Sequence, residues 1–179
     1  MPRRDDLESI MVLGSGPIKI GQAAEFDFSG SQAVRALRED GYKVILVNSN
    51  PATIQNDTEM ADVVYIEPLL PDTIAKILEK ERPCALLAGM GGQTALNIAS
   101  ELSHNGTLER LGVELIGSDL DAIDKAEDRE LFNQVCESIN LPISQAVACN
   151  SIDEVIAAAE LIGSWPILIR PAFTLGGLG

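Results

Sequence analysis

The carboxyl-terminal residues 167–179 combine groups that suit an anion-binding loop. An apolar run with the composition of a strand ends at Arg170 and a proline, and three of the last four residues are glycine. Glycine lets the backbone approach a ligand closely, so that successive N–H groups can converge on phosphate oxygens. The planar guanidinium of Arg170 presents paired donors to the same oxygens. These residues therefore predict phosphate binding; the alternative is a plain strand with a surface arginine and a Gly-rich tail.

Positive charge is scarce around this loop. Between residues 126 and 179 the only basic residues are Arg129 and Arg170, against seven acidic ones, and the whole chain has a net charge of −14. General nucleic-acid binding depends on basic surface that neutralises phosphates, so the composition argues against it. An anionic ligand needs local positive charge, and Arg170 stands at the mouth of the Gly-rich loop. The chain ends inside that loop, so we expect it to be the front part of a longer protein.

Short apolar strands alternate with helical segments ahead of this loop. Nearly all-apolar strands that alternate with helices indicate a parallel sheet covered on both faces. The expected fold is therefore α/β, with a Rossmann-like domain over residues 1–120. Strands are expected at residues 9–13, 43–48, 63–66, 85–88 and 114–116, and helices at residues 29–40, 71–81 and, after a short loop, 90–102.

The pattern changes after Gly117, and a second domain is expected over residues 121–179. This domain is an incomplete α/β subdomain, because the chain ends within it. Ser151 and Glu154 fit a capping box, so we expect them to serve helix formation and not chemistry. The expected elements are a helix at residues 124–138 with Asp124 as its N-cap, a strand at 141–149, a helix at 151–161 and a strand at 165–170.

A Gly-rich turn at residues 14–22 follows the first strand and invites two phosphate-binding interpretations. A dinucleotide fingerprint needs a third glycine where this chain has Lys19, and an acidic residue where the second strand ends in Asn48. A P-loop needs Lys and then Ser or Thr after its last glycine, but glutamine and alanine follow Gly21. Both interpretations fail.

Three small, polar and Gly-rich loops nevertheless follow expected strands, at residues 14–22, 48–53 and 91–94. The carboxyl ends of parallel strands meet at one edge of the sheet, where doubly wound folds bind ligands. A site or a tight domain contact is therefore expected at this edge. Ordinary turns, each stabilised by its own residues, are the alternative.

Few other residues are candidates for chemistry. His104, the only histidine, lies in a polar segment after an expected helix and should be an exposed loop residue. Glu25 and Asp27 could form a carboxylate pair, but a capping or structural role fits them equally well. The three cysteines are odd in number and widely spaced, without metal-ligand spacing, which favours buried thiols in a reducing compartment over a disulfide. No apolar run reaches the length of a membrane-spanning helix.

Five motifs, in register, resemble the amino-terminal part of the large subunit of carbamoyl phosphate synthetase. They are GSGPIKIGQAAEFDFSG at residues 14–30, VNSNPATI at 47–54, MGGQTALN at 90–97, DAIDKAEDR at 121–129 and IRPAFTLGG at 169–177. The resemblance covers the whole chain and about the first sixth of such a subunit. Ala172 and Leu178 stand where many members carry other small or polar residues, which bears on closure of the loop and not on the resemblance.

The resemblance implies an ATP-dependent ligase that makes carbamoyl phosphate from bicarbonate, ammonia and two ATP. The domain at residues 1–120 then precedes an ATP-grasp module that makes carboxyphosphate, a phosphoryl transfer that depends on positioning and charge neutralisation. The implied ATP contacts are Arg129, Arg170 and the backbone of Gly176 and Gly177. Ligands for Mg or Mn are implied in the later part of the module, outside this chain.

The resemblance also implies partners. Ammonia usually comes from glutamine through a small amidotransferase subunit, and a second ATP-grasp half phosphorylates carbamate. The parent protein is expected to be oligomeric and cytoplasmic, or to lie in an organelle after removal of a transit peptide. We expect no nucleic-acid or membrane partner, and no synthetase activity from these residues alone. Two other interpretations stay open: a noncatalytic Rossmann-like module that binds NAD or another nucleotide, which Lys19 and Asn48 argue against, and a module that docks a glutaminase partner.

Overall fold

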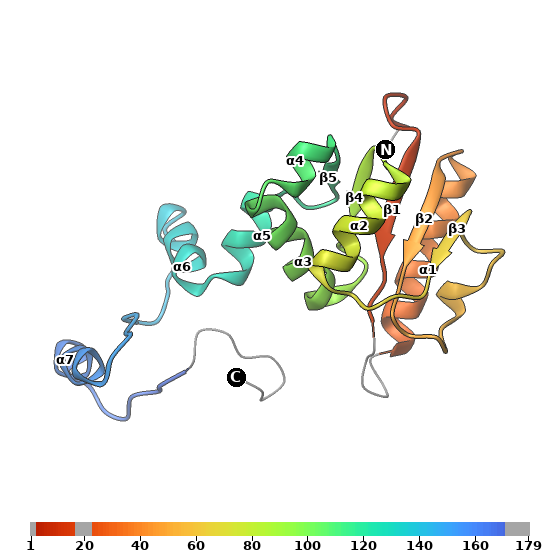
Figure 1. Cartoon of the computed structure of the whole chain (residues 1–179). Helices are drawn as coiled ribbons and strands as arrows, with labels where there is room; N and C mark the ends of the chain where they lie inside the picture. The colour runs from red at the N-terminus through yellow and green to blue at the C-terminus, as the bar shows by residue number, and fades with distance from the viewer. Residues whose placement is uncertain (1–2, 17–22, 171–179) are drawn as a thin grey trace. The chain divides into compact units, whose positions relative to one another are not determined.

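The structure is a computed structural model that describes residues 3–16 and 23–170 (Figure 1). The chain divides into two compact units, residues 1–123 and residues 124–179, and each is described here by itself. The first unit contains the sheet that the sequence predicts. The second contains helices.

A five-stranded parallel sheet forms the centre of the first unit (Figure 1). The spatial order of the strands is β3-β2-β1-β4-β5, so the first strand of the chain lies in the middle. Met11 of β1 pairs with Ile45 of β2 on one side and with Leu86 of β4 on the other. The strands are β1 (Ser9–Leu13), β2 (Lys43–Val47), β3 (Val63–Tyr65), β4 (Ala85–Leu87) and β5 (Glu114–Ile116).

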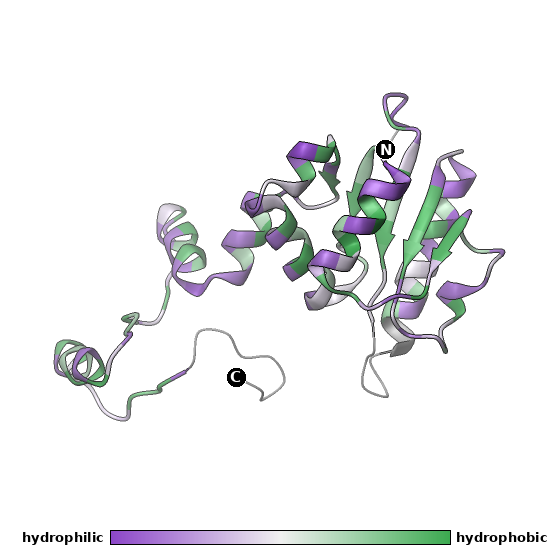
Figure 2. Ribbon diagram, in the orientation of Figure 1, coloured by the Kyte–Doolittle hydropathy of each residue, from purple (hydrophilic) through white to green (hydrophobic). Residues whose placement is uncertain are grey.

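Helices cover both faces of this sheet, as the all-apolar strands predict. Successive residues of a strand point to opposite faces. Met11 and Leu13 accordingly pack in one apolar cluster with α2, α3 and α4, whereas Ile10 and Val12 pack in a second cluster with α1. Figure 2 shows the apolar strands between helices that carry polar and apolar stripes. The helices of this unit are α1 (Ala23–Glu39), the 3-10 helix η1 (Ile54–Asn56), α2 (Pro71–Glu81), α3 (Gly92–His104) and α4 (Thr107–Leu111).

Helix α1 begins well before the position that the sequence predicts. The helix is expected over residues 29–40, but it already begins at Ala23. The carbonyl of Phe26 and the carboxylate of Asp27, both in the added turns, accept hydrogen bonds from Gln55 and Thr53, contacts that the local sequence does not show. The sequence also gave no indication of α4, a single short helix bounded by Gly106 and Gly112, both in the left-handed conformation.

Asp128 divides the helix expected over residues 124–138 into α5 (Leu120–Glu127) and α6 (Arg129–Ser138). Its backbone is extended, and its carboxylate accepts hydrogen bonds from the N–H groups of Glu130 at 2.8 Å and Leu131 at 3.0 Å. Asp128 is therefore the N-cap of α6, a role that the sequence predicted for Asp124.

The capping box predicted for the next helix is confirmed. Helix α7 (Ile152–Ile162) begins after Ser151, whose hydroxyl oxygen accepts a hydrogen bond from the N–H of Glu154 at 3.3 Å. The carboxylate of Glu154 in turn accepts from the N–H of Asn150 at 2.6 Å, one residue ahead of the usual partner in this motif.

The strands expected at residues 141–149 and 165–170 are wrong. Within the described part of the second unit, residues 124–170, no segment forms a strand. A strand needs a neighbour that pairs with its backbone N–H and C=O groups, and these two segments have none there. Their apolar composition alone does not fix their conformation.

A cluster around Tyr65 makes a prediction about acid stability. The Tyr65 hydroxyl donates to a carboxylate oxygen of Glu81 at 2.6 Å, and Lys43 Nζ lies 3.4 Å from the other oxygen. These two donors, Tyr65 foremost, lower the pKa of Glu81 below its usual 4.5. A group whose pKa is lowered by folding stabilises the protein above its unfolded pKa, and that contribution is lost as the pH falls through the lowered value.

We expect Tyr65→Phe to reduce the free energy of unfolding at pH 7 by about 1 kcal/mol, the value of one hydrogen bond to a partly buried acceptor. The difference from wild type should shrink as the pH falls below 4, because Glu81 becomes protonated in both proteins. Urea denaturation at a series of pH values measures this. Tyr42→Phe is the control, since the Tyr42 hydroxyl bonds to the backbone of Arg4 and to no carboxylate. Equal pH dependence of the two variants would contradict the prediction.

Candidate functional site at the carboxyl edge of the sheet

The loops after β1 and β4 lie side by side at the carboxyl edge, the edge of the sheet where the strands end. Strand order reverses here, and doubly wound sheets bind ligands at such a point. A Cβ atom on Gly91 would lie 2.5 Å from the carbonyl oxygen of Gly14 and 2.7 Å from that of Leu13. The two backbones therefore touch, and no ligand fits between them. Residues 17–22 of the Gly-rich turn, Lys19 among them, lie outside the described residues.

The side-chain amide of Asn48 holds the loop after β1. Asn48 is fully buried, and its Oδ1 accepts hydrogen bonds from the N–H groups of Gly16 at 3.0 Å and Asn50 at 3.2 Å. Its Nδ2 donates to Oε1 of Gln55 at 3.4 Å. Residue 14 must be glycine for this arrangement, because a Cβ on Gly14 would lie 2.6 Å from the amide. Asn48 thus joins the loop after β1 to the loop after β2.

The amide of Gln55, also fully buried, extends this network to α1. Its Nε2 donates to the carbonyl oxygen of Phe26 at 2.9 Å and lies 3.4 Å from Oδ1 of Asp27. The Thr53 hydroxyl donates to the same Asp27 oxygen at 2.7 Å. Gly30 leaves room for Gln55, since a Cβ there would lie 2.8 Å from its amide. Three loop or helix segments are therefore tied together by side-chain hydrogen bonds.

Asp27 has a structural role in this network, one of the two possibilities that the sequence left open. Its carboxylate accepts from Thr53 and Gln55, and the side chain of Glu25 lies outside the described residues. Sequence reasoning missed Asn48 and Gln55 as network residues. A polar residue directly after an apolar strand is the one available signal for Asn48, and nothing in the sequence marks Gln55 as buried.

The residues predicted to contact phosphate belong to the second unit. Arg129 is the first residue of α6, directly after the N-cap Asp128. Arg170 is exposed at the end of the described chain, and Gly176 and Gly177 lie outside the described residues. The assignment of the two arginines to one phosphate site therefore stays a prediction.

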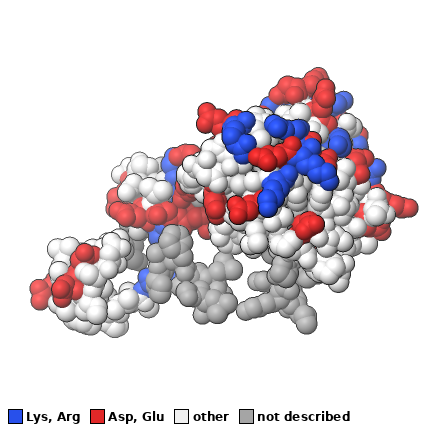
Figure 3. Space-filling view, viewed as in Figure 1, with Lys and Arg blue, Asp and Glu red and all other residues white. Residues whose placement is uncertain are grey.

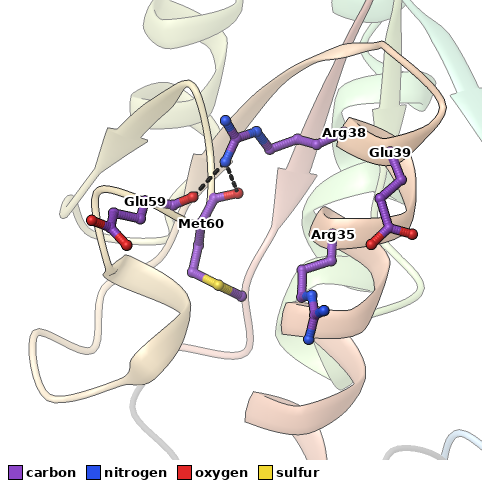
Figure 4. A pocket seen from close by; sticks show the side chains of 5 residues that line it. All are labelled: Arg35, Arg38, Glu39, Glu59 and Met60. Carbon is purple, nitrogen blue, oxygen red and sulfur yellow. Dashed lines mark hydrogen bonds between the residues drawn. The ribbon is translucent and has the colours of Figure 1, made fainter.

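A groove beside α1 is lined by charges of both signs (Figure 4). Arg38 donates to two backbone carbonyl groups across this groove, those of Glu59 and Met60, and its Nε lies 3.6 Å from a carboxylate oxygen of Asp62. Arg38 therefore fixes the chain ahead of β3. We assign it no ligand. The lining residues are Arg35, Arg38, Glu39, Glu59 and Met60.

The other residues considered from the sequence have ordinary surroundings. His104 is exposed, but it ends α3 instead of lying in a loop, and a ring nitrogen is 3.2 Å from Oγ of Ser100. The three cysteines carry free thiols; Cys136 is buried as predicted, but Cys84 and Cys149 are only half-buried. In residues 3–16 and 23–170, no three His, Cys, Asp or Glu side chains gather as a metal site. Over the same residues, no helix has the length and apolarity needed to cross a membrane.

The sheet and its flanking helices define the class as an α/β protein of Rossmann-like architecture, which solved structures support. The biotin carboxylase domain of a single-chain bacterial carboxylase matches with a TM-score of 0.60 and 13% identity, over 90% of this chain and 36% of that chain. The biotin carboxylase domain of Hydrogenobacter thermophilus 2-oxoglutarate carboxylase, solved with MgADP and bicarbonate, matches with a TM-score of 0.62 and 16% identity, over 88% and 34%. At these identities the likeness establishes the fold.

Sequence comparison identifies the family. Residues 6–125 match the carbamoyl phosphate synthase preATP-grasp domain, and residues 128–179 match the carbamoyl-phosphate synthase L chain, ATP binding domain. All 179 residues align at 59% identity with the carbamoyl phosphate synthase large chain, N-terminal section, of Aquifex aeolicus and with the carbamoyl phosphate synthase large chain of Synechocystis sp.. The chain belongs to the carbamoyl phosphate synthase large-chain family, which confirms the resemblance. It spans 32% of the Aquifex protein and 17% of the Synechocystis protein.

Proposed function

We propose that the chain is the carboxyphosphate-forming region of a carbamoyl phosphate synthase, an ATP-dependent ligase. The observation that carries this proposal is the order of the two family matches, residues 6–125 followed by residues 128–179. We place the domain boundary at residues 120–121, close to the division of the compact units after Ile123. A solved structure of the same fold holds MgADP and bicarbonate, which are among the ligands that this function requires.

In the proposed reaction an oxygen of bicarbonate attacks the γ-phosphorus of ATP, ADP leaves, and carboxyphosphate forms. Negative charge develops on the transferred and leaving groups, so positioned cations and N–H donors lower the barrier. We assign this role to the guanidinium groups of Arg129 and Arg170 and to the backbone N–H groups of Gly176 and Gly177. The scarcity of positive charge supports the assignment, since these two arginines are the only basic residues between residues 126 and 179.

The remaining components of the reaction lie beyond this region. Magnesium or manganese would neutralise phosphate charge, and we place its ligands in the later part of the ATP-grasp module, which this chain does not cover. Ammonia from glutamine, delivered by a small amidotransferase subunit, then attacks the carboxyl carbon of carboxyphosphate; the C–O bond to the phosphate breaks, inorganic phosphate leaves, and carbamate forms. A second ATP-grasp half phosphorylates carbamate. We further propose an oligomeric parent protein in the cytoplasm or an organelle.

A chimeric protein tests this proposal. The 179 residues of this chain would replace the matched region of the Synechocystis large chain, with which they align over their whole length. We expect the chimera, supplied with ammonium, bicarbonate and ATP, to make carbamoyl phosphate at a rate comparable to the unmodified protein. The chain by itself should show no bicarbonate-dependent ATP turnover. A folded chimera without synthesis would overturn the proposal, and turnover by the chain by itself would contradict its dependence on the missing parts.

Removal of one arginine tests the site. In the chimera we expect Arg170→Ala to raise the KM for ATP by about tenfold, the effect of losing about 1.5 kcal/mol from a charge-assisted hydrogen bond. Steady-state kinetics of bicarbonate-dependent ATP hydrolysis measures this. Arg35→Ala is the matched control, because Arg35 is an exposed arginine of the groove on α1 (Figure 4). Equal KM values for the two variants would rule out the assigned role of Arg170.

A further inference from the structure

The connection between α3 and α4 holds a pair of residues that the proposed function does not use. Asn105 is the C-cap of α3, and Gly106 follows it as the N-cap of α4, with φ 75°. Asn105 is the one asparagine of the chain that precedes glycine, because each of the others is followed by a residue with a side chain. Without such a side chain, nothing hinders the approach of the next backbone nitrogen to the asparagine amide.

The surroundings of this pair are open to water. Asn105 is exposed, and a Cβ atom placed on Gly106 would have no neighbouring atom within 4 Å. Figure 3 shows charged side chains of both signs over the upper part of the first unit, where α4 lies in Figure 1. Water therefore reaches the Asn105 side chain, and water is the reactant that completes the deamidation of an asparagine.

A hydrogen bond prepares the Asn105 amide for attack. Its Oδ1 accepts from the N–H of Thr107 at 3.0 Å. This contact is an Asx turn, and the ring of atoms that it closes contains the Gly106 nitrogen, so the side chain folds back toward that nitrogen. The N–H of Thr107 also polarises the carbonyl group and stabilises the negative charge that forms on Oδ1 during attack, as an oxyanion-hole donor does.

The Gly106 nitrogen is the nucleophile of this reaction, and it is held at a helix end. Its N–H donates to the carbonyl oxygen of Ser103 at 3.0 Å, in the last turn of α3. Helix ends open more readily than the strands of a core, and glycine places little limit on the rotation that brings its nitrogen to the asparagine Cγ. The attack therefore needs no unfolding of the sheet.

Other asparagines lack this combination of features. Asn48 is fully buried, and its Oδ1 is held by two N–H groups. Asn50 precedes proline, which has no N–H to lose. Asn97 and Asn133 lie inside α3 and α6, where helical hydrogen bonds hold the nitrogen of the next residue.

We propose that Asn105 is a site of spontaneous deamidation, which converts it to isoaspartate in the folded protein. The Gly106 nitrogen loses its proton to water and attacks Cγ. The bond from Cγ to Nδ2 then breaks, and ammonia leaves with a proton taken from water. The resulting succinimide adds one water molecule at either carbonyl group and opens to aspartate or isoaspartate. The chain thereby gains one negative charge.

Isoaspartate adds one CH₂ group to the main chain between α3 and α4. The N–H of Arg110 donates to the carbonyl oxygen of Gly106 at 2.9 Å, and Leu108 is buried in the apolar cluster with α2 and α3. The longer main chain displaces this attachment of α4. The modification needs only the fold of the first unit, so failure of the proposed function leaves it unaffected.

Ageing of the folded 179-residue chain in a mildly alkaline buffer tests this proposal. Methylation with S-adenosylmethionine by a protein isoaspartyl methyltransferase counts the isoaspartate, and peptide mass spectrometry locates it. We expect isoaspartate at residue 105 to exceed that at any other asparagine by about tenfold or more, which corresponds to a barrier lower by ~1.4 kcal/mol. Circular dichroism shows that the chain stays folded during the incubation.

Two glycine variants form a matched pair for this test. Gly106→Ala should lower the isoaspartate at residue 105 by about tenfold, because its methyl group hinders the attack. Gly112→Ala should leave it unchanged. Gly112 has a similar left-handed φ of 69°, and a Cβ there also meets no atom within 4 Å, so both variants carry the same backbone strain. If Gly106→Ala does not fold, Asn105→Gln replaces it and should remove most of the isoaspartate that the methyltransferase counts.

The outcomes decide between modification and protection of this site. Isoaspartate at residue 105 that forms in urea but not in the folded chain would mean that the bond to Ser103 protects Asn105, and it overturns the proposal. Isoaspartate spread over several asparagines, or equal amounts in Gly106→Ala and Gly112→Ala, also overturns it. Isoaspartate confined to residue 105 of the folded chain supports the proposal, whether or not the chimera makes carbamoyl phosphate.

Discussion

Replacing Gly91 with valine is expected to lower the free energy of unfolding by about 3 kcal/mol or more, the upper range for overpacking a rigid site. The new Cβ would meet the carbonyl oxygens of Gly14 and Leu13 at 2.5 and 2.7 Å and Ala95 Cβ at 2.4 Å. Two of these atoms belong to the backbone of the central strand and its loop, which cannot turn aside as a side chain does. The backbone of Gly91, with φ −105°, is accessible to any residue, so the effect is steric.

Gly89 in the same loop provides the matched control for this substitution. A Cβ there would have no atom within 4 Å, so Gly89→Val should change the stability by less than about 1 kcal/mol. Urea denaturation followed by far-UV circular dichroism measures both variants. Similar unfolding midpoints for the two would mean that the loops after β1 and β4 can separate, and that the carboxyl edge is not a tight backbone contact.

Asn48→Ala is expected to lower the free energy of unfolding by about 3 kcal/mol, because each buried group left without its hydrogen bond costs about 1 to 3 kcal/mol. The substitution leaves the N–H groups of Gly16 and Asn50 and the Oε1 of Gln55 without their present partner. Hydrogen exchange of the Gly16 amide offers a local measurement beside the unfolding curve. Its exchange should accelerate under conditions in which the rest of the sheet stays protected.

The comparison for this network is Asn50→Ala. Asn50 makes a similar local contact, its Oδ1 accepting from the N–H of Ala52 at 3.0 Å, but the contact is exposed to water. Solvent can replace the lost acceptor there, so the loss should stay below about 1 kcal/mol. If both variants lose the same free energy of unfolding, burial of the Asn48 amide does not determine how much that side chain stabilises the protein.

The sheet could be predicted from the sequence because each strand is buried on both faces and therefore reads as an apolar run. All five strands occur within one residue of the predicted ends. The beginning of α1 could not be predicted, because its first turns are joined by hydrogen bonds to Thr53 and Gln55 of the loop after β2, and the local sequence does not show these contacts. The predicted edge of converging loops is present, but the buried amides that order it depend on contacts between residues far apart in the chain.

In the second unit the composition predicts strands, but the described residues provide no neighbouring strand with which they could pair. Its described apolar residues are mostly exposed, with Cys136 and Ala158 as the buried ones. Helices α6 and α7 still form, since a helix satisfies its own backbone and is fixed locally by Asp128 and Ser151. The segments at residues 141–149 and 165–170 depend on a neighbouring strand, which local sequence cannot supply.

The central position of β1 has a consequence for synthesis of the protein on the ribosome. One side of β1 pairs with β2 soon after both have been made, but its other side pairs with β4, where Ile10 meets Ala85. At about 5 to 20 residues per second, the intervening chain takes several seconds to appear. During that time the nascent chain presents an unpaired apolar strand, a template for aggregation, so newly made chains should depend on ribosome-associated chaperones until β4 has emerged.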